Sequence, residues 1–160
     1  MVAMSEIETL LDRYAHGCEL LRSALQQFTA SDYDALPIPG KWSVRQVVCH
    51  IADFEPVYLD RMKRVLVEDN PTFFGADPSV FAAGLAYDTR EVGEELDLID
   101  LTRRQMVRIL RNCDIEVFQR TGVHSEDGPM TMETLLERIA GHIPHHIRFI
   151  EEKAAALRAA

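Results

Sequence analysis

The chain has 160 residues, of which 47% are hydrophobic, which is typical of a single folded domain with one apolar core. Its net charge of -9 and its pI of about 5.1 disfavour binding to the phosphate backbone of nucleic acids. No stretch approaches the roughly 18 apolar residues of a membrane span, and the first residues do not resemble a secretory signal. We therefore expect one domain over residues 1–160, located in the cytoplasm, with no nucleic-acid or membrane partner.

The first expected helix spans residues 5–28. Its apolar residues recur in alternating steps of four and three, which is the pattern of a helix with one face packed in a bundle. Ser5 and Glu8 form a capping-box pattern at its start. His16 lies on the side opposite the apolar residues, so we expect it to be exposed to solvent and not to bind a ligand.

The second expected helix spans residues 43–66. Ser43 and Gln46 form a capping box at its start, and His50 lies at one border of its apolar face. Residues 67–87 then contain two prolines, two glycines and three phenylalanines. A connection of this length with several aromatic residues is expected to pack against the bundle, and we interpret it as a cover over a cleft.

The third expected helix spans residues 88–112, with acidic residues in its first turn and an apolar stripe along one face. Residues 114–129 show no sustained periodicity, so we expect an irregular connection with at most a short helical turn. His124 belongs to this connection. We expect it to be exposed, as isolated loop histidines usually are.

The fourth expected helix spans residues 131–157, and Thr131 can cap its start. His142 and His146 lie one turn apart on one face of this helix, which places their imidazoles close enough to bind one ion. His146 is directed at the core, and His142 lies at the border of the apolar face. His145 is rotated by roughly 100° from both, so we expect it to lie outside any site that they form.

The four helices predict an all-α four-helix bundle, and the histidines on its inward faces predict a metal site. A buried imidazole without a hydrogen-bond partner costs roughly 1–3 kcal/mol, so a single buried histidine is usually paired with another polar group. Three histidines on two helices, His50, His142 and His146, are better explained by a shared metal ion. Three imidazoles leave other coordination positions open, which is typical of a catalytic site.

Zinc and nickel are the ions that we expect first at such a site, with iron, copper and manganese as alternatives. A bound ion lowers the pKa of water or of a thiol. Zincin and di-iron sites are excluded, because no glutamate follows His142 and the chain has no Glu-x-x-His pair. Two interpretations stay open: an enzyme that activates water or a thiol for attack on a small electrophile, and a non-catalytic helical module with a structural ion or none.

Three short motifs of this chain resemble those of the DinB-like superfamily, which includes bacterial thiol S-transferases and maleylpyruvate isomerase-like proteins. The motifs are KWSVRQVVCHIADFE at residues 41–55, GPMTME at residues 128–133, and the pair His142-x-x-x-His146. They occur in the order expected for the family. The similarity covers nearly the whole chain.

The resemblance implies a DinB-like four-helix bundle with a long crossover connection, which holds one divalent ion by three histidines near one end. Those positions here are His50, His142 and His146. It also implies a small-molecule substrate, an activity of the thiol S-transferase or hydrolase type, and a low-molecular-weight thiol as a candidate co-substrate. It implies a homodimer and no binding to DNA.

Four residues close to the proposed ligands have weaker interpretations. Asp53, one turn after His50, is either a carboxylate that orients this imidazole or a solvated acid. Glu55 is a candidate general base, although an ion pair with an arginine on a helix is the preferred interpretation. Cys49 points away from the ligand face, so we expect no catalytic thiolate there. Trp42 is expected to pack in the core at the start of the second helix.

Overall fold

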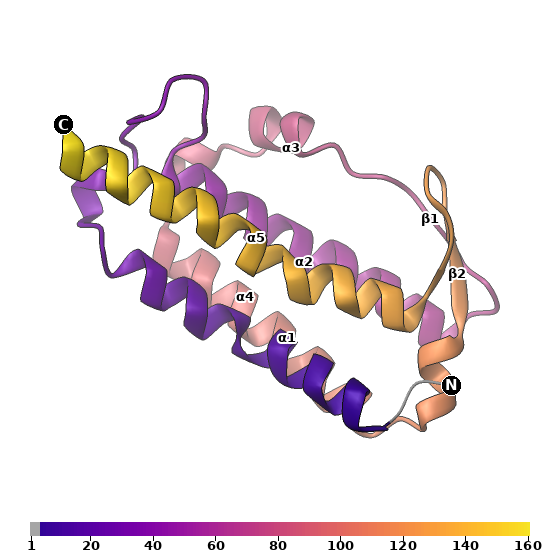
Figure 1. Cartoon of the computed structure of the whole chain (residues 1–160). Helices are drawn as coiled ribbons and strands as arrows, with labels where there is room; N and C mark the ends of the chain where they lie inside the picture. Colours follow the sequence, from indigo (N-terminus) through magenta and orange to yellow (C-terminus); the bar gives the residue numbers. More distant parts are fainter. Residues whose placement is uncertain (1–3) are drawn as a thin grey trace.

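The computed structural model describes residues 4–160 and shows four long helices packed side by side (Figure 1). They are α1 (Met4–Leu25), α2 (Val44–Val67), α4 (Val92–Leu110) and α5 (Met132–Ala159). A long crossover connection returns the chain between α2 and α4, so these two helices run in the same direction (Figure 1). The predicted all-α four-helix bundle with a crossover is confirmed. No helix in residues 4–160 has the length and apolarity needed to cross a membrane.

Capping residues explain where α2 and α5 begin. The Ser43 hydroxyl accepts a hydrogen bond from the Gln46 amide at 3.2 Å, and the Ser43 amide donates to Gln46 Oε1 at 2.9 Å, which is the predicted capping box. At α5, the Thr131 hydroxyl accepts from the Thr134 amide at 3.1 Å, as predicted. The predicted cap at Ser5 is wrong, because α1 already includes the residue before it.

The apolar faces of the helices form two clusters of buried residues, and a buried ion pair lies where these clusters meet. Arg103 Nη2 lies 2.6 Å from Glu55 Oε1, and both side chains are almost completely buried. Arg103 also donates to the carbonyls of Tyr14 at 2.8 Å and Ile139 at 2.9 Å. A side chain at Gly17 would collide with the guanidinium. One arginine of α4 therefore bonds to α1, α2 and α5 at the centre of the bundle.

The crossover connection is ordered and packs partly against α2. It contains β1 (Thr72–Phe73), the short helix α3 (Pro78–Gly84) and a 3-10 turn (Tyr87–Thr89). Phe73 is buried, and the Phe81 ring lies 5.6 Å from the Phe54 ring of α2, so two of the three phenylalanines pack as predicted. Phe74 does not, because 77% of its surface is exposed.

The connection between α4 and α5 differs from the prediction of an irregular segment. It consists of a 3-10 helix (Ile115–Gln119), β2 (Thr121–His124) and β3 (Gly128–Thr131). The two strands form an antiparallel hairpin, and β1 pairs with β2 in parallel. His124 is 6% exposed and not solvated, because its Nδ1 accepts hydrogen bonds from the Glu126 and Asp127 amides in the hairpin turn. His16 is exposed on α1, as predicted.

Candidate metal centre

The three predicted ligands lie on α2 and α5, which pack against each other. His50 comes from α2, and His142 and His146 are one turn apart on α5. His50 Nε2 is 3.0 Å from the Nε2 atoms of both His142 and His146, and these two are 3.2 Å apart. The structure therefore brings together the residues that the sequence predicted. His145 is exposed and lies outside the group, with its ring 5.1 Å from that of His146.

The spacing of the three nitrogens fits a metal ion. An ion that binds imidazole nitrogens at about 2.0–2.1 Å with tetrahedral or octahedral angles separates them by about 2.8–3.4 Å. The three observed separations, from 3.0 to 3.2 Å, fall within this range. In the part of the chain that the structure describes, this is the only group of histidine, cysteine or acidic side chains with such a geometry.

Burial keeps the three imidazoles neutral. It lowers the pKa of His50 to about 4, that of His142 to about 2 and that of His146 to about 3, and neighbouring histidines add to the effect. A neutral Nε2 atom is either a donor or an acceptor, so at least one of the three contacts between them cannot be a hydrogen bond. A cation bound by all three lone pairs removes this conflict. The donor set therefore fits a divalent ion.

The second ring nitrogens of His50 and His142 are also informative. Both Nδ1 atoms are buried and have no hydrogen-bond partner in residues 4–160. The remaining nitrogen of a metal-binding histidine usually donates to a carboxylate, a carbonyl or water. No protein group in residues 4–160 fills this role, so the orientation of the two rings depends on the packing around them.

The histidine group lines a pocket of about 400 Å³. The rings of Trp42 and Phe54 form part of its wall, with centroids 5.2 and 4.7 Å from that of His50. Pro78 of α3 also lines the pocket, so the crossover connection forms part of its wall, and its role as a cover over a cleft stays a prediction. Trp42 packs partly in the core, as predicted, and its position in the pocket wall was not predicted.

Two polar residues of this pocket, Tyr58 and Arg138, were also not predicted. Arg138 Nη1 lies 2.6 Å from Asp127 Oδ2, and both side chains are about half exposed. Tyr58 follows His50 by eight residues on α2, and Arg138 precedes His142 by four residues on α5. These spacings place each residue on the ligand face of its helix, and they are the sequence signal that identifies both.

Asp53 has neither of the two roles considered for it. Its Oδ1 lies 2.8 Å from Arg90 Nη2, and its side chain is 12% exposed. Arg90 also pairs with Glu95 at the start of α4. Asp53 is therefore part of a structural ion-pair network that joins α2 to α4, and it is not a solvated acid.

For Glu55, the ion-pair interpretation is confirmed, because both nitrogen contacts to its Oε1 come from Arg103. The expectation for Cys49 is also confirmed. Its thiol is buried and donates to the Tyr87 carbonyl at 3.8 Å, and burial raises its pKa to about 11. A thiol with such a pKa is protonated at neutral pH and is a poor nucleophile.

Comparison with known proteins extends these observations. The chain matches the sequence model of the DinB superfamily over residues 8–150. It is 29% identical over 133 residues to "Putative metal-dependent hydrolase YfiT" of Bacillus subtilis, covering 82% of this chain and 75% of the relative. A protein of Oceanobacillus iheyensis with the same descriptive name is 27% identical over 131 residues, covering 82% of this chain and 76% of the relative.

A solved structure also matches closely. YfiT from Bacillus subtilis, described as "a probable metal-dependent hydrolase with an unusual four-helix bundle topology", has a TM-score of 0.90 at 24% identity. The match covers 98% of this chain and 90% of that chain. The two proteins therefore share their fold.

The crossover bundle and the three-histidine group define a helical protein with a candidate metal centre between α2 and α5. Because the family model matches most of its length, the chain belongs to the DinB superfamily. The resemblance inferred from the three motifs is confirmed. The homodimer and the cytoplasmic location stay predictions.

Proposed function

We propose that this protein is a divalent-metal-dependent hydrolase of a small-molecule substrate, with His50, His142 and His146 as the metal ligands. The observation that carries the proposal is the convergence of three Nε2 atoms, 3.0–3.2 Å apart, in the wall of a pocket of about 400 Å³. A pocket of this size suits a small molecule. The names of the Bacillus and Oceanobacillus relatives support the same assignment for members of the family.

Three imidazoles leave coordination positions of an ion free for water and substrate. When bound, such an ion supplies an activated water near neutral pH and polarises a carbonyl or a related group. The chain contributes the environment of the reaction. The rings of Trp42 and Phe54 exclude bulk water from one side, which strengthens electrostatic interactions in the pocket. Tyr58 and Arg138 supply polar groups that can orient a substrate.

We propose zinc or nickel as the ion, with iron, copper and manganese as alternatives. Imidazole ligands suit the first four of these, whereas manganese prefers oxygen ligands. A low-molecular-weight thiol is the alternative reactant of the same site, because a bound cation also favours the deprotonated form of a thiol. Thiol transfer therefore belongs in the same test as hydrolysis.

The test is elemental analysis of protein purified without a metal-affinity tag, followed by assays with a panel of small esters and amides. We expect about one ion per chain, and hydrolysis that stops on chelation and returns when the ion is restored. The same preparations are assayed for conjugation of a thiol to small electrophiles. Metal-dependent conjugation without hydrolysis would replace the hydrolase by a transferase, and a chain that binds no ion would favour the non-catalytic module.

Replacing His145 with alanine is expected to leave the metal content unchanged. Its ring is exposed, and its nitrogens lie outside the group formed by His50, His142 and His146. The measurement is the ratio of metal to protein after removal of free ions, with His16→Ala on the exposed side of α1 as the control. A ratio reduced by half or more in the His145 variant alone would place His145 among the ligands.

A further inference from the structure

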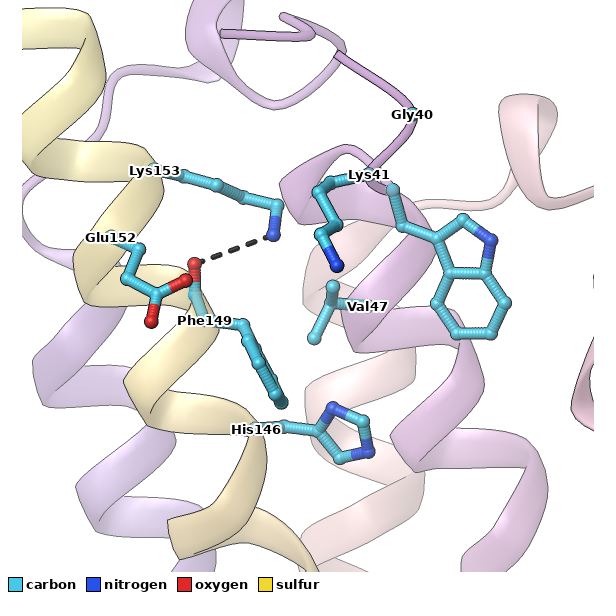
Figure 2. A pocket seen from close by; sticks show the side chains of 8 residues that line it. Gly40, Lys41, Val47, His146, Phe149, Glu152 and Lys153 are labelled. Atoms are coloured by element: carbon cyan, nitrogen blue, oxygen red, sulfur yellow. Dashed lines mark hydrogen bonds between the residues drawn. The ribbon is translucent and has the colours of Figure 1, made fainter. Parts of the chain in front are cut away.

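A second pocket, of about 260 Å³, adjoins the histidine group at His146 (Figure 2). His146 and Trp42 line both pockets, so the two are neighbours. Away from His146, the side chains of Lys41 and Lys153 both extend into the second pocket, Lys41 from the segment before α2 and Lys153 from α5 (Figure 2). Lys153 follows His146 by seven residues on α5, which places it on the same face of the helix two turns later.

The ammonium group of Lys153 is buried, and no acidic side chain in residues 4–160 forms an ion pair with it. The residue is 3% exposed, and its Nζ donates to the Phe149 carbonyl at 3.3 Å. Neither Lys153 nor Lys41 forms an ion pair in the portion of the chain from residue 4 to residue 160. Burial lowers the pKa of Lys153, and the nearby Lys41 lowers it further, whereas Glu152 acts in the opposite direction.

This placement differs from that of an ordinary lysine on a helix surface. Such a lysine packs its aliphatic stem against the protein and extends its ammonium group into water. Lys153 instead directs its ammonium group into the pocket, which a second lysine also lines (Figure 2). Because an unpaired buried cation is unfavourable, a bound anion would relieve this arrangement.

The charge and the walls of the pocket define the ligand that fits it. The two lysines and the exposed Glu152 give the lining a net charge of +1, so a ligand with one negative charge neutralises it. A dianion such as phosphate would leave excess negative charge beside Glu152. Val47 and Phe149 provide apolar walls on the way to the histidine group (Figure 2). The features together match a carboxylate attached to a short apolar chain.

We propose that this pocket binds the carboxylate of a small, partly apolar acid, with Lys41 and Lys153 as its anion-binding residues. Its role as a substrate subsite rests on the proposed function, because an acid anchored at the lysines would extend its apolar part past His146 to the metal centre. The binding of the carboxylate does not itself require the ion. The two proposals can therefore be tested separately.

The test is a titration of metal-free protein with hexanoate, followed by the fluorescence of Trp42, which is the only tryptophan of the chain and lines the pocket. We expect a saturable change with hexanoate, and binding at least about tenfold weaker with hexan-1-ol, which has the same chain without the charge. Lys153→Met and Lys41→Met are each expected to weaken hexanoate binding about tenfold or more. Inorganic phosphate should compete less well than hexanoate.

The remaining lysine of the chain, Lys63, provides the matched control. It lies on α2 outside the pocket and donates to Gln105 Oε1, so Lys63→Met makes the same chemical change and should bind hexanoate like the wild type. Lys41 is exposed in the segment before α2, so its variant tests the pocket even if Lys153→Met unfolds. The proposal is overturned if hexanoate produces no saturable change, if hexan-1-ol binds equally well, if phosphate binds better, or if both pocket variants behave like Lys63→Met.

The metal content of the same proteins separates this proposal from the proposed function. Lys41→Met and Lys153→Met should retain the ion, since neither lysine belongs to the histidine group. Hexanoate binding by a protein that never binds an ion would support the pocket and remove the hydrolase. A protein that binds the ion but not hexanoate would overturn the carboxylate pocket and leave the proposed hydrolase unaffected.

Discussion

Replacing His146 with alanine is expected to abolish the binding of a divalent ion and any activity that depends on it. His146 Nε2 lies 3.0 Å from that of His50 and 3.2 Å from that of His142, so the variant keeps only two of the three converging nitrogens. Loss of a residue that merely supports a metal ligand lowers metal affinity about 10–100-fold. Removal of a ligand itself should lower it further, because the ligand's contribution to the binding free energy is lost outright.

The measurement is the melting temperature with the ion and after chelation. At an ion concentration of 100 times Kd, binding to the native state adds about 2.7 kcal/mol to the free energy of unfolding, which corresponds to roughly 5–11 °C for a domain of this size. The wild type should show this shift and His146→Ala should not. His146 is only partly buried, so the loss of stability without the ion should stay below the roughly 2–5 kcal/mol of a truncated core side chain.

His145→Ala is the matched control for this variant, because it removes the neighbouring exposed imidazole, which lines the same pocket but lies outside the three-histidine group. It should keep the shift in melting temperature. A His146→Ala protein that retained one ion per chain and its full shift would show that His146 is not a ligand, and the hydrolase proposed on the three-histidine site would fall with it.

Apolar periodicity was sufficient to predict the four helices, whereas the predicted caps are correct at Ser43 and Thr131 but not at Ser5. The helix predicted over residues 43–66 is observed as Val44–Val67, and the one predicted over 131–157 as Met132–Ala159. The first helix ends at Leu25, although Phe28 continues the apolar pattern. Phe28 is buried from a turn that follows the helix. The apolar periodicity therefore predicted the burial of Phe28 correctly, but not its backbone conformation.

The small sheet was missed because its strands are short and depend on distant partners. β1 (Thr72–Phe73) pairs with β2 across about fifty residues of sequence, and neither strand is long enough to show alternation. The burial of His124 follows from the same hairpin, since its Nδ1 accepts hydrogen bonds from two backbone amides of the turn. The periodicity of a short sequence segment gives no information about such contacts between strands or within a turn.

The histidine group was predictable because helical spacing fixes which residues share a face. His142 and His146 are four residues apart, and the apolar residues of α2 place His50 at the border of its inward face. The lysine pocket was not predictable in this way. Lys41 lies before α2, and its position opposite Lys153 follows from how that segment packs against α5, which no periodicity reveals.

Replacing Arg103 with methionine is expected to lower the free energy of unfolding by about 3–5 kcal/mol. The change leaves the Glu55 carboxylate fully buried without its cation, and it removes the donors to the carbonyls of Tyr14 and Ile139. Burial already raises the pKa of Glu55, and Arg103 opposes this effect. The measurement is the denaturant concentration at the midpoint of unfolding of the variant and the wild type. It reports stability if the dependence of the unfolding free energy on denaturant is the same in both proteins.

The adjacent Arg104 provides the control, because its ion pair with Asp100 is 3.3 Å long and its side chain is 66% exposed. Arg104→Met should cost at most about 1 kcal/mol. The double variant Arg103→Met with Glu55→Leu should cost less than the sum of its single changes, since no unpaired charge stays buried. Equal losses for the two arginine variants would show that the central ion pair contributes no more than a surface pair.

The same variants connect the ion pair to the metal centre. Arg103 joins Glu55, five residues after His50 on α2, to Ile139, three residues before His142 on α5. It therefore helps to set how the two ligand-bearing helices lie against each other. The buried Nδ1 atoms of His50 and His142 have no protein partner in residues 4–160, so no hydrogen bond would hold these rings in place if the helices shifted. We expect Arg103→Met to bind the ion more weakly than the wild type under conditions where both are folded, and Arg104→Met to bind it equally well. Unchanged metal affinity in folded Arg103→Met would limit the role of the ion pair to stability.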